Sequence, residues 1–118
     1  MFEFVKESGP FMVVRASDTV TEDDYKLIAP MLDKLIKMNG TLSCLIDVSK
    51  VTDITPGGIL EDFKLSHRHK DDFKRVAIMG KKSWMDEMAA ISNALSNAEI
   101  QYFDEDEESQ AMEWLEEK

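Results

Sequence analysis

The sequence predicts an α/β fold in which a mixed, mostly parallel sheet of five strands is combined with about four helices. Two short apolar runs near the N-terminus are separated by a Ser-Gly-Pro turn, and apolar runs then alternate with segments of helical periodicity to the end of the chain. Strands that alternate with helices are joined by right-handed crossovers, which make them parallel. We therefore expect a single domain over residues 1–118, with the element order β, β, α, β, α, β, α, β, α.

The first half of the chain is expected to form a hairpin and a helix. FEFVKE and FMVVRAS are rich in β-branched and aromatic residues, and the turn at Ser8-Gly9-Pro10 favours an antiparallel pair. Thr21 is the expected N-cap of a helix with acids in its first turn, which complement the helix dipole. This helix should bend at Pro30 and end near Asn39-Gly40. Its apolar face consists of Tyr25, Ile28, Leu32, Leu35 and Ile36.

The second half is expected to continue the alternation. TLSCLIDVS is typical of a buried central strand, in which Cys44 is a small core residue. A helix is predicted from Ile59 to about Lys70, followed by the strand FKRVAIMG. KSWMDEMAAISNAL predicts a further helix, EIQYF a last short strand, and EESQAMEWLEE a final helix.

Charge and composition limit the class of protein. The net charge is −10, and residues 104–118 hold eight acids and one lysine, so that most of the acidity lies in this tail. Phosphate binding needs concentrated Lys and Arg, so no nucleic acid partner is expected. A single cysteine excludes an internal disulfide and a multi-thiolate metal site. No window approaches the ~20 apolar residues that span a bilayer and no signal peptide is recognised, so we expect a cytoplasmic protein.

The turn TPGG, which comprises Thr55, Pro56, Gly57 and Gly58, is the first candidate site. Glycines between a strand and a helix can cradle a phosphate with backbone amides. The turn lacks the Lys and Ser/Thr of a P-loop and the three-glycine spacing of dinucleotide sites. Pro56 fixes its own backbone and the glycines accept unusual dihedrals, so the sequence favours a tight structural turn.

Two histidines lie in SHRHKDDF, at positions that point in different directions on a helix and cannot chelate one metal unless the helix has already ended. His67 shares a stripe with Leu60 and Phe63 and is expected to be semi-buried, whereas His69 is expected at a solvated helix end. No serine lies in a recognisable nucleophile elbow. We therefore predict no catalytic residue, metal or cofactor.

GKKSWMDEM follows a predicted parallel strand and should lie at the same sheet edge as the TPGG turn. Apolar residues on two helices face each other there, which predicts an adaptable apolar groove for a nonpolar or amphipathic ligand. The alternative is that the same side chains pack together as part of the hydrophobic core. Lys81, Lys82 and Trp84 would suit contact with a membrane surface. The predicted groove is lined by Leu60, Phe63, Trp84, Met85 and Met88.

Three segments together resemble the SpoIIAA-like family of bacterial STAS-related proteins across nearly the whole chain. They are TEDDYKLIAPMLDKLI, the stretch from CLIDVSK to SWMDEM, and IQYFDEDEESQAMEWL, with an LxD strand, a Thr-Pro-Gly turn, GxxxW and YFD in order. The resemblance implies the fold of anti-anti-sigma factors, also likened to the lipid-binding domain of CRAL-TRIO proteins. It implies no established enzyme activity, and suggests binding of nonpolar ligands and association with membrane surfaces.

Anti-anti-sigma factors carry a phosphorylated serine in the corresponding turn. Counting from Asp47, that serine falls on Gly57 and the preceding serine on Pro56, so neither can be phosphorylated. Thr55 is the nearest hydroxyl. The resemblance therefore implies the fold without the phosphorylation switch.

Two functions follow as expectations. The leading one is a non-enzymatic binding domain that holds a nonpolar molecule or lipid and docks transiently on membranes. The alternative is a STAS-type interaction regulator that presents the TPGG turn and the helix from Ile59 to a protein partner. A homodimer is a further expected form of association.

Overall fold

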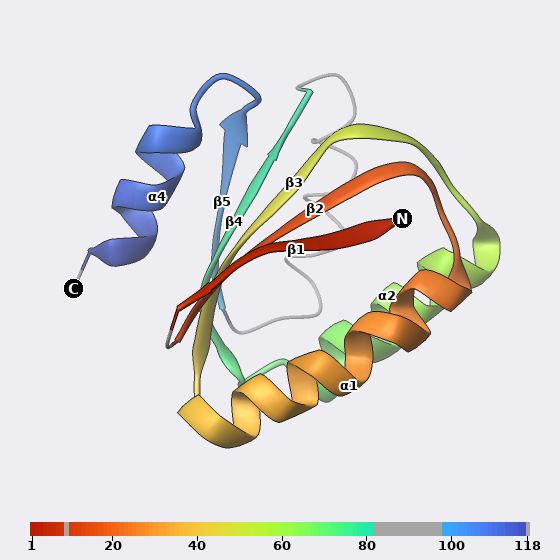
Figure 1. Ribbon diagram of the computed structural model, residues 1–118, viewed down its shortest axis with the longest axis horizontal. Helices are drawn as coiled ribbons and strands as arrows, with labels where there is room; N and C mark the ends of the chain where they lie inside the picture. The colour runs from red at the N-terminus through yellow and green to blue at the C-terminus, as the bar shows by residue number, and fades with distance from the viewer. Residues whose placement is uncertain (9, 82–97, 118) are drawn as a thin grey trace.

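The chain folds around a mixed sheet with helices on both of its faces (Figure 1). The computed structural model describes residues 1–8, 10–81 and 98–117. The five strands lie in the order β1-β2-β3-β4-β5, with β1 antiparallel to β2 and all other neighbours parallel, as predicted. The strands are β1 (Phe2–Ser8), β2 (Phe11–Val20), β3 (Leu42–Ile54), β4 (Phe73–Gly80) and β5 (Glu99–Asp104).

The helices of the described residues are α1 (Glu22–Asn39), α2 (Pro56–Arg68) and α4 (Glu108–Glu116). These are three helices rather than the expected four or so, and the helix expected over residues 82–95 lies outside the described residues. None of the three is long and apolar enough to cross a membrane. α1 continues through Pro30.

Local interactions hold the start of α1 as its sequence predicts. The backbone N–H of Thr21 donates to the Asp24 carboxylate at 2.8 Å, and the ammonium group of Met1 lies 3.2 Å from the same carboxylate. Burial alone would raise the pKa of Asp24, but the Thr21 N–H and the Met1 charge hold this pKa below its ordinary value. The N-terminus of the chain is thereby tied to the N-terminus of α1.

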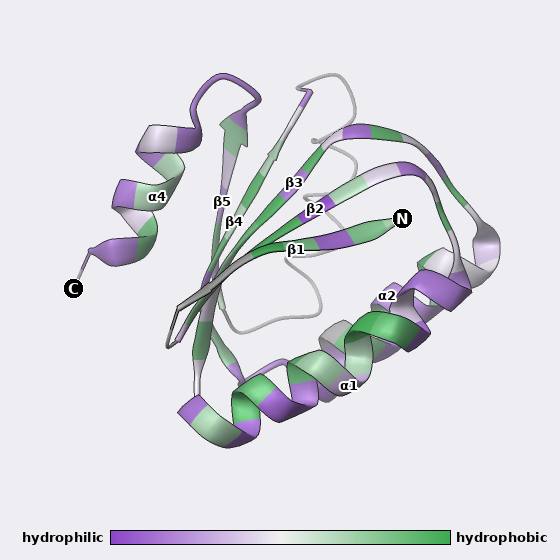
Figure 2. Cartoon of the chain, viewed as in Figure 1, coloured by the Kyte–Doolittle hydropathy of each residue, from purple (hydrophilic) through white to green (hydrophobic). Residues whose placement is uncertain are grey.

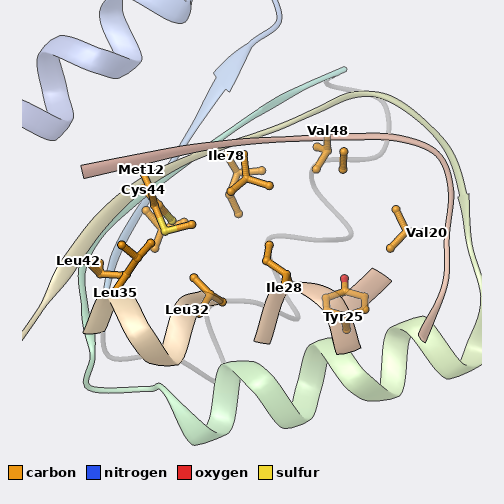
Figure 3. Packing of buried hydrophobic residues seen from close by; sticks show 13 residues of the cluster. Met12, Val20, Tyr25, Ile28, Leu32, Leu35, Leu42, Cys44, Val48 and Ile78 are labelled. Atoms are coloured by element: carbon orange, nitrogen blue, oxygen red, sulfur yellow. The ribbon is translucent and has the colours of Figure 1, made fainter. Parts of the chain in front are cut away.

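The two faces of the sheet bury separate cores, because successive strand residues point to opposite faces. Figure 3 shows the α1 residues Tyr25, Ile28, Leu32 and Leu35 directed toward the sheet, and Figure 2 shows the apolar positions along the strands. Cys44 is buried in this core as predicted, and burial raises the pKa of its thiol to about 12. The opposite core, under α4, consists of Val13, Leu45, Ala77, Met79, Phe103, Ala111 and Leu115.

α4 is held on its face of the sheet by Arg75 of β4. The guanidinium group lies 5.1 Å from the ring centroid of Trp114 and 3.1 Å from the Glu99 carboxylate, and it donates to the Trp114 carbonyl. One side chain thus joins β4, β5 and α4.

β2 and β3 continue past the end of β4 as a two-stranded parallel arm. The described pairing of β3 with β4 ends at Asp47 opposite Met79, whereas β2 and β3 stay paired as far as Val20 and Ile54. At the branch point the Asp47 carboxylate accepts from the Ser49 backbone N–H at 2.9 Å and from its hydroxyl at 2.6 Å. The arm curves over to the N-terminal ends of α1 and α2, and so carries the TPGG turn (Figure 1).

Candidate functional site

The turn between β3 and α2 is closed by its own hydrogen bonds. Thr55 is the N-cap of α2, and its hydroxyl oxygen accepts from the Gly58 N–H at 3.0 Å. Its carbonyl accepts from the Ile59 N–H, and its own N–H donates to the Val20 carbonyl, each at 2.9 Å. The Thr55 hydroxyl is therefore a structural cap, and the turn is fixed to the end of β2.

Unusual dihedrals do not explain the two glycines of the turn, and close approach of the backbone explains Gly58 alone. Neither has a positive φ; among the described glycines this is found at Gly40. A Cβ on Gly58 would lie 2.9 Å from the Val20 carbonyl oxygen, which is backbone and cannot move aside. A Cβ on Gly57 would meet only the end of the flexible Glu22 side chain, also at 2.9 Å. The expectation about dihedrals was wrong, and Gly58 is needed because β2 passes directly beside it.

The same contacts argue against a phosphate cradle at the start of α2. Pro56 has no N–H, and the N–H groups of Gly58 and Ile59 are already bonded to Thr55. The Glu22 carboxylate lies against Gly57 and would repel an anion. The geometry therefore supports the structural turn that the sequence favoured.

The outer side of this turn is apolar and exposed. Pro56 is exposed, and the exposed fractions of Ile59 and Leu60 are 40% and 53%. We call Pro56, Ile59 and Leu60 the turn patch. Asp53, three residues before Pro56, is exposed, and so is Asp18 on the paired strand β2. The patch is an apolar surface with acidic neighbours on a rigid support.

The predicted ligand groove falls largely on residues outside the described ones. Trp84, Met85 and Met88, and the proposed membrane residue Lys82, all lie among residues 82–97. The remaining residues are described: Leu60 and Lys81 are exposed, and Phe63 is half-buried. The groove and the membrane contact therefore stay predictions.

The inner face of α2 differs from the predicted stripe of Leu60, Phe63 and His67. His67 is exposed, and His69, expected in solvent, is buried with 7% exposure. The inner line is instead formed by residues at positions 58, 62, 65 and 69, which are spaced by four, three and four. Three of these four residues are Gly, Asp or His, so an apolar pattern could not reveal the line.

His69 joins three elements at the end of α2. Its Nε2 lies 2.8 Å from the Asp33 carboxylate on α1, and its Nδ1 lies 2.7 Å from Asp72 just before β4. Arg68 also donates to Asp33 at 3.2 Å. The nearby Asp72 is a signal that the sequence offered, whereas Asp33 is 36 positions away and gave none. Among the described residues no cluster has the ligands to hold a metal ion.

Comparison with known proteins assigns the fold to a family. The sequence profile of SpoIIAA-like proteins matches residues 11–116. The chain belongs to the SpoIIAA-like family. No curated protein matches it. The resemblance of the sequence to SpoIIAA-like proteins is thereby confirmed at the level of the family.

Two solved structures share the fold of this SpoIIAA-like domain. A crystal structure of an uncharacterized protein with a SpoIIAA-like fold from Shewanella loihica PV-4 is 24% identical, with a TM-score of 0.79, over 97% of this chain and 93% of that one. The anti-sigma factor antagonist SpoIIAA in its unphosphorylated form is 9% identical, with a TM-score of 0.64, over 96% and 98% of the two chains. These likenesses show the fold; the CRAL-TRIO likeness stays a prediction.

The Asp62 side chain, in the second turn of α2, carries a carboxyl group that is bonded to α1. Asp62 is largely enclosed, and burial raises the pKa of its carboxyl group, although a hydrogen bond from the Tyr25 hydroxyl acts in the opposite direction. Burial and the Asp62 charge likewise raise the pKa of Tyr25. Phe2 packs edge-on against the Tyr25 ring at 5.0 Å. The ionised carboxylate is thus held where the fold disfavours its charge.

Asp62→Asn should therefore raise the free energy of unfolding at pH 7. The pKa of the Asp62 carboxyl is higher in the folded than in the unfolded protein. The contribution of this group to the free energy of unfolding is therefore fully present below the unfolded pKa, and it is lost as the pH rises through the folded pKa. The gain from Asn, which cannot ionise, should be present at pH 7 and vanish near the ordinary Asp pKa of 3.8. Urea unfolding of both proteins across this pH range measures the difference. A gain of equal size at all pH values would contradict the ionisation argument.

Proposed function

We propose that this SpoIIAA-like domain is a non-enzymatic interaction module that presents the turn patch to a protein partner. The observation that carries the proposal is the contrast between the two sides of the turn. Its inner groups are bonded to β2, whereas Ile59 and Leu60 on its outer side are exposed and do not belong to either core.

A rigid apolar surface of this kind is favourable for binding. Exposed apolar side chains on a fixed backbone lose little conformational entropy when a partner covers them. Binding residues are commonly carried on loops that a rigid scaffold positions. The turn patch meets both conditions, because Thr55 and Val20 fix its backbone.

The charges around the turn patch support a partner with basic groups at its rim. Asp18, Glu22 and Asp53 are exposed and the Glu22 carboxylate lies beside Gly57, whereas Lys64, four residues after Leu60, is paired with Glu61 at 3.5 Å. Rim charges of opposite sign on a partner would speed association, and this contribution would fall with salt. We expect apolar side chains of the partner to pack on Ile59 and Leu60.

Leu60→Arg should abolish capture of the partner and leave the fold intact. Leu60 is more than half exposed, so the substitution places a charge in the interface without disturbing the core. The measurement is affinity capture from a lysate of the source cells, with quantitative mass spectrometry of the bound proteins. Leu27→Arg, on the exposed side of α1, is the matched control.

The proposal fails if a specifically captured protein binds the Leu60→Arg variant as well as it binds the wild type. Thermal unfolding of each variant verifies that the fold is retained. Gly58→Arg is unsuitable as a surface probe, because its Cβ would strike the Val20 carbonyl oxygen.

The same proteins test the predicted nonpolar ligand. Native mass spectrometry before and after organic extraction would reveal a bound molecule as an extra mass that extraction removes. An unchanged mass after incubation with liposomes or fatty acids would leave the interaction module as the function.

A further inference from the structure

A second apolar surface lies on α1, away from the turn patch. Leu27, Met31 and Met38 have exposed fractions of 74%, 43% and 68%. Together with Lys34 they are spaced by four, three and four residues, which places them in one line along the helix. We call these four residues the α1 stripe. Such spacing is that of a helix seam which packs against another helix.

The α1 stripe is continuous with the edge of the sheet. Leu27 and Met31 form a shallow hollow together with Asp24 and Ile28 of α1 and with Phe2 and Phe4 of β1. β1 is the outermost strand beside β2, and α1 and β1 lie on the same side of the molecule in Figure 1. Figure 2 shows the apolar segments on α1. The exposed apolar area therefore extends from the helix to the strand.

The charges beside the α1 stripe are separated along the helix. Glu22 and Asp23 are exposed in the first turn, where Lys26 lies 4.0 Å from Asp23 and leaves this end with a net negative charge, and Lys34 and Lys37 are exposed in the last turns. The intervening Asp33 is bonded to Arg68 and His69. The surface is thus acidic at one end, apolar in the middle and basic at the other end. A surface with this order is complementary to itself when it is turned end for end.

We propose that the α1 stripe is a self-association surface, on which α1 of a second copy packs in antiparallel orientation about a two-fold axis near Met31. In this arrangement Leu27 of one copy covers the aliphatic stem of Lys34 in the other. In an antiparallel pair the same flanks of both helices meet, so Asp23 of one copy faces Lys37 of the other. The two-fold axis repeats this Asp23–Lys37 pair, so one pair lies at each end of the interface.

Sedimentation equilibrium over a range of protein concentrations tests this arrangement. The wild type should shift from 13.5 kDa toward twice this mass as concentration rises. Leu27→Arg should raise the dissociation constant of the dimer at least tenfold, because one arginine from each copy enters the same apolar interface. Leu60→Arg, which disrupts the turn patch, should dimerise as the wild type does. The two leucine variants thus separate this proposal from the proposed function.

Charge reversal makes the test specific to orientation. Asp23→Lys and Lys37→Glu should each weaken the dimer, since each places like charges opposite one another, and the double variant should restore it. Both positions of the cycle are exposed and neither substitution lowers helix propensity, so circular dichroism should be unchanged.

A protein that stays at 13.5 kDa up to millimolar concentration would overturn the proposal. A dimer that Leu27→Arg leaves unchanged would overturn it as well. Failure of the double variant to recover the affinity lost in the single variants would exclude the antiparallel orientation.

Discussion

Gly58→Ala is expected to lower the free energy of unfolding by about 1–3 kcal/mol, the usual cost of forcing extra atoms into a packed site. The added Cβ would lie 2.9 Å from the Val20 carbonyl oxygen and 3.1 Å from the Ile54 side chain. Relief requires β2 to move away from α2, which stretches the hydrogen bond from Thr55 to Val20. Urea unfolding followed by circular dichroism measures the loss.

Gly57→Ala is the matched control for this substitution. Its Cβ would also have a neighbour at 2.9 Å, but the neighbour is the carboxylate end of Glu22, which can turn away. Alanine favours a helix over glycine by up to about 1 kcal/mol, so stability should be unchanged or higher. An equal loss in both variants would show that helix entry, and not the approach of β2, determines the need for glycine.

His69→Ala should lower the free energy of unfolding by about 2–3 kcal/mol, in the range of hydrogen bonds to charged groups. The ring is buried and lies within hydrogen-bonding distance of Asp33 and Asp72. Its removal leaves two carboxylates beside a cavity without their common partner. Thermal and urea unfolding at neutral pH measure the effect.

His67→Ala provides the corresponding control, because His67 is two residues away on the same helix and is exposed. Its effect should stay within about 0.5 kcal/mol, as is usual for surface positions. A comparable loss in both variants would mean that the end of α2 contributes through helix stability alone. His69→Asn, which keeps one donor, should fall between the wild type and His69→Ala.

The fold was predictable because its signals are local and repeated. Apolar strands alternate with helical segments in the described residues, the N-cap at Thr21 begins α1, and Cys44 is buried in a central strand; each of these is confirmed. These signals depend on neighbours within a few residues, where the periods of helix and strand are fixed by backbone geometry. Long and regular segments therefore gave the architecture.

The face of α2 was not predictable in the same way. Its inner line contains Gly58, Asp62 and His69, whose burial depends on Val20, Tyr25 and Asp33 in other elements. A glycine required by a passing strand and a histidine paired across two helices leave no apolar pattern. His67 was accordingly expected to be semi-buried and His69 to lie in solvent, whereas the structure places them the other way round.

Hydrogen exchange in the arm formed by β2 and β3 should show whether a partner is bound at the turn that the arm carries. From Lys50 to Ile54 the described pairing of β3 is with β2 alone, so within this sheet only those amide hydrogens that point toward β2 are protected by a paired strand. Hydrogen exchange there should be fast in the free protein and slow once a partner covers the tip. The strand-paired amides of the central strands, away from the arm, should exchange at the same rate in either state. The arm can thus show where contact occurs even when the bound partner has not been identified.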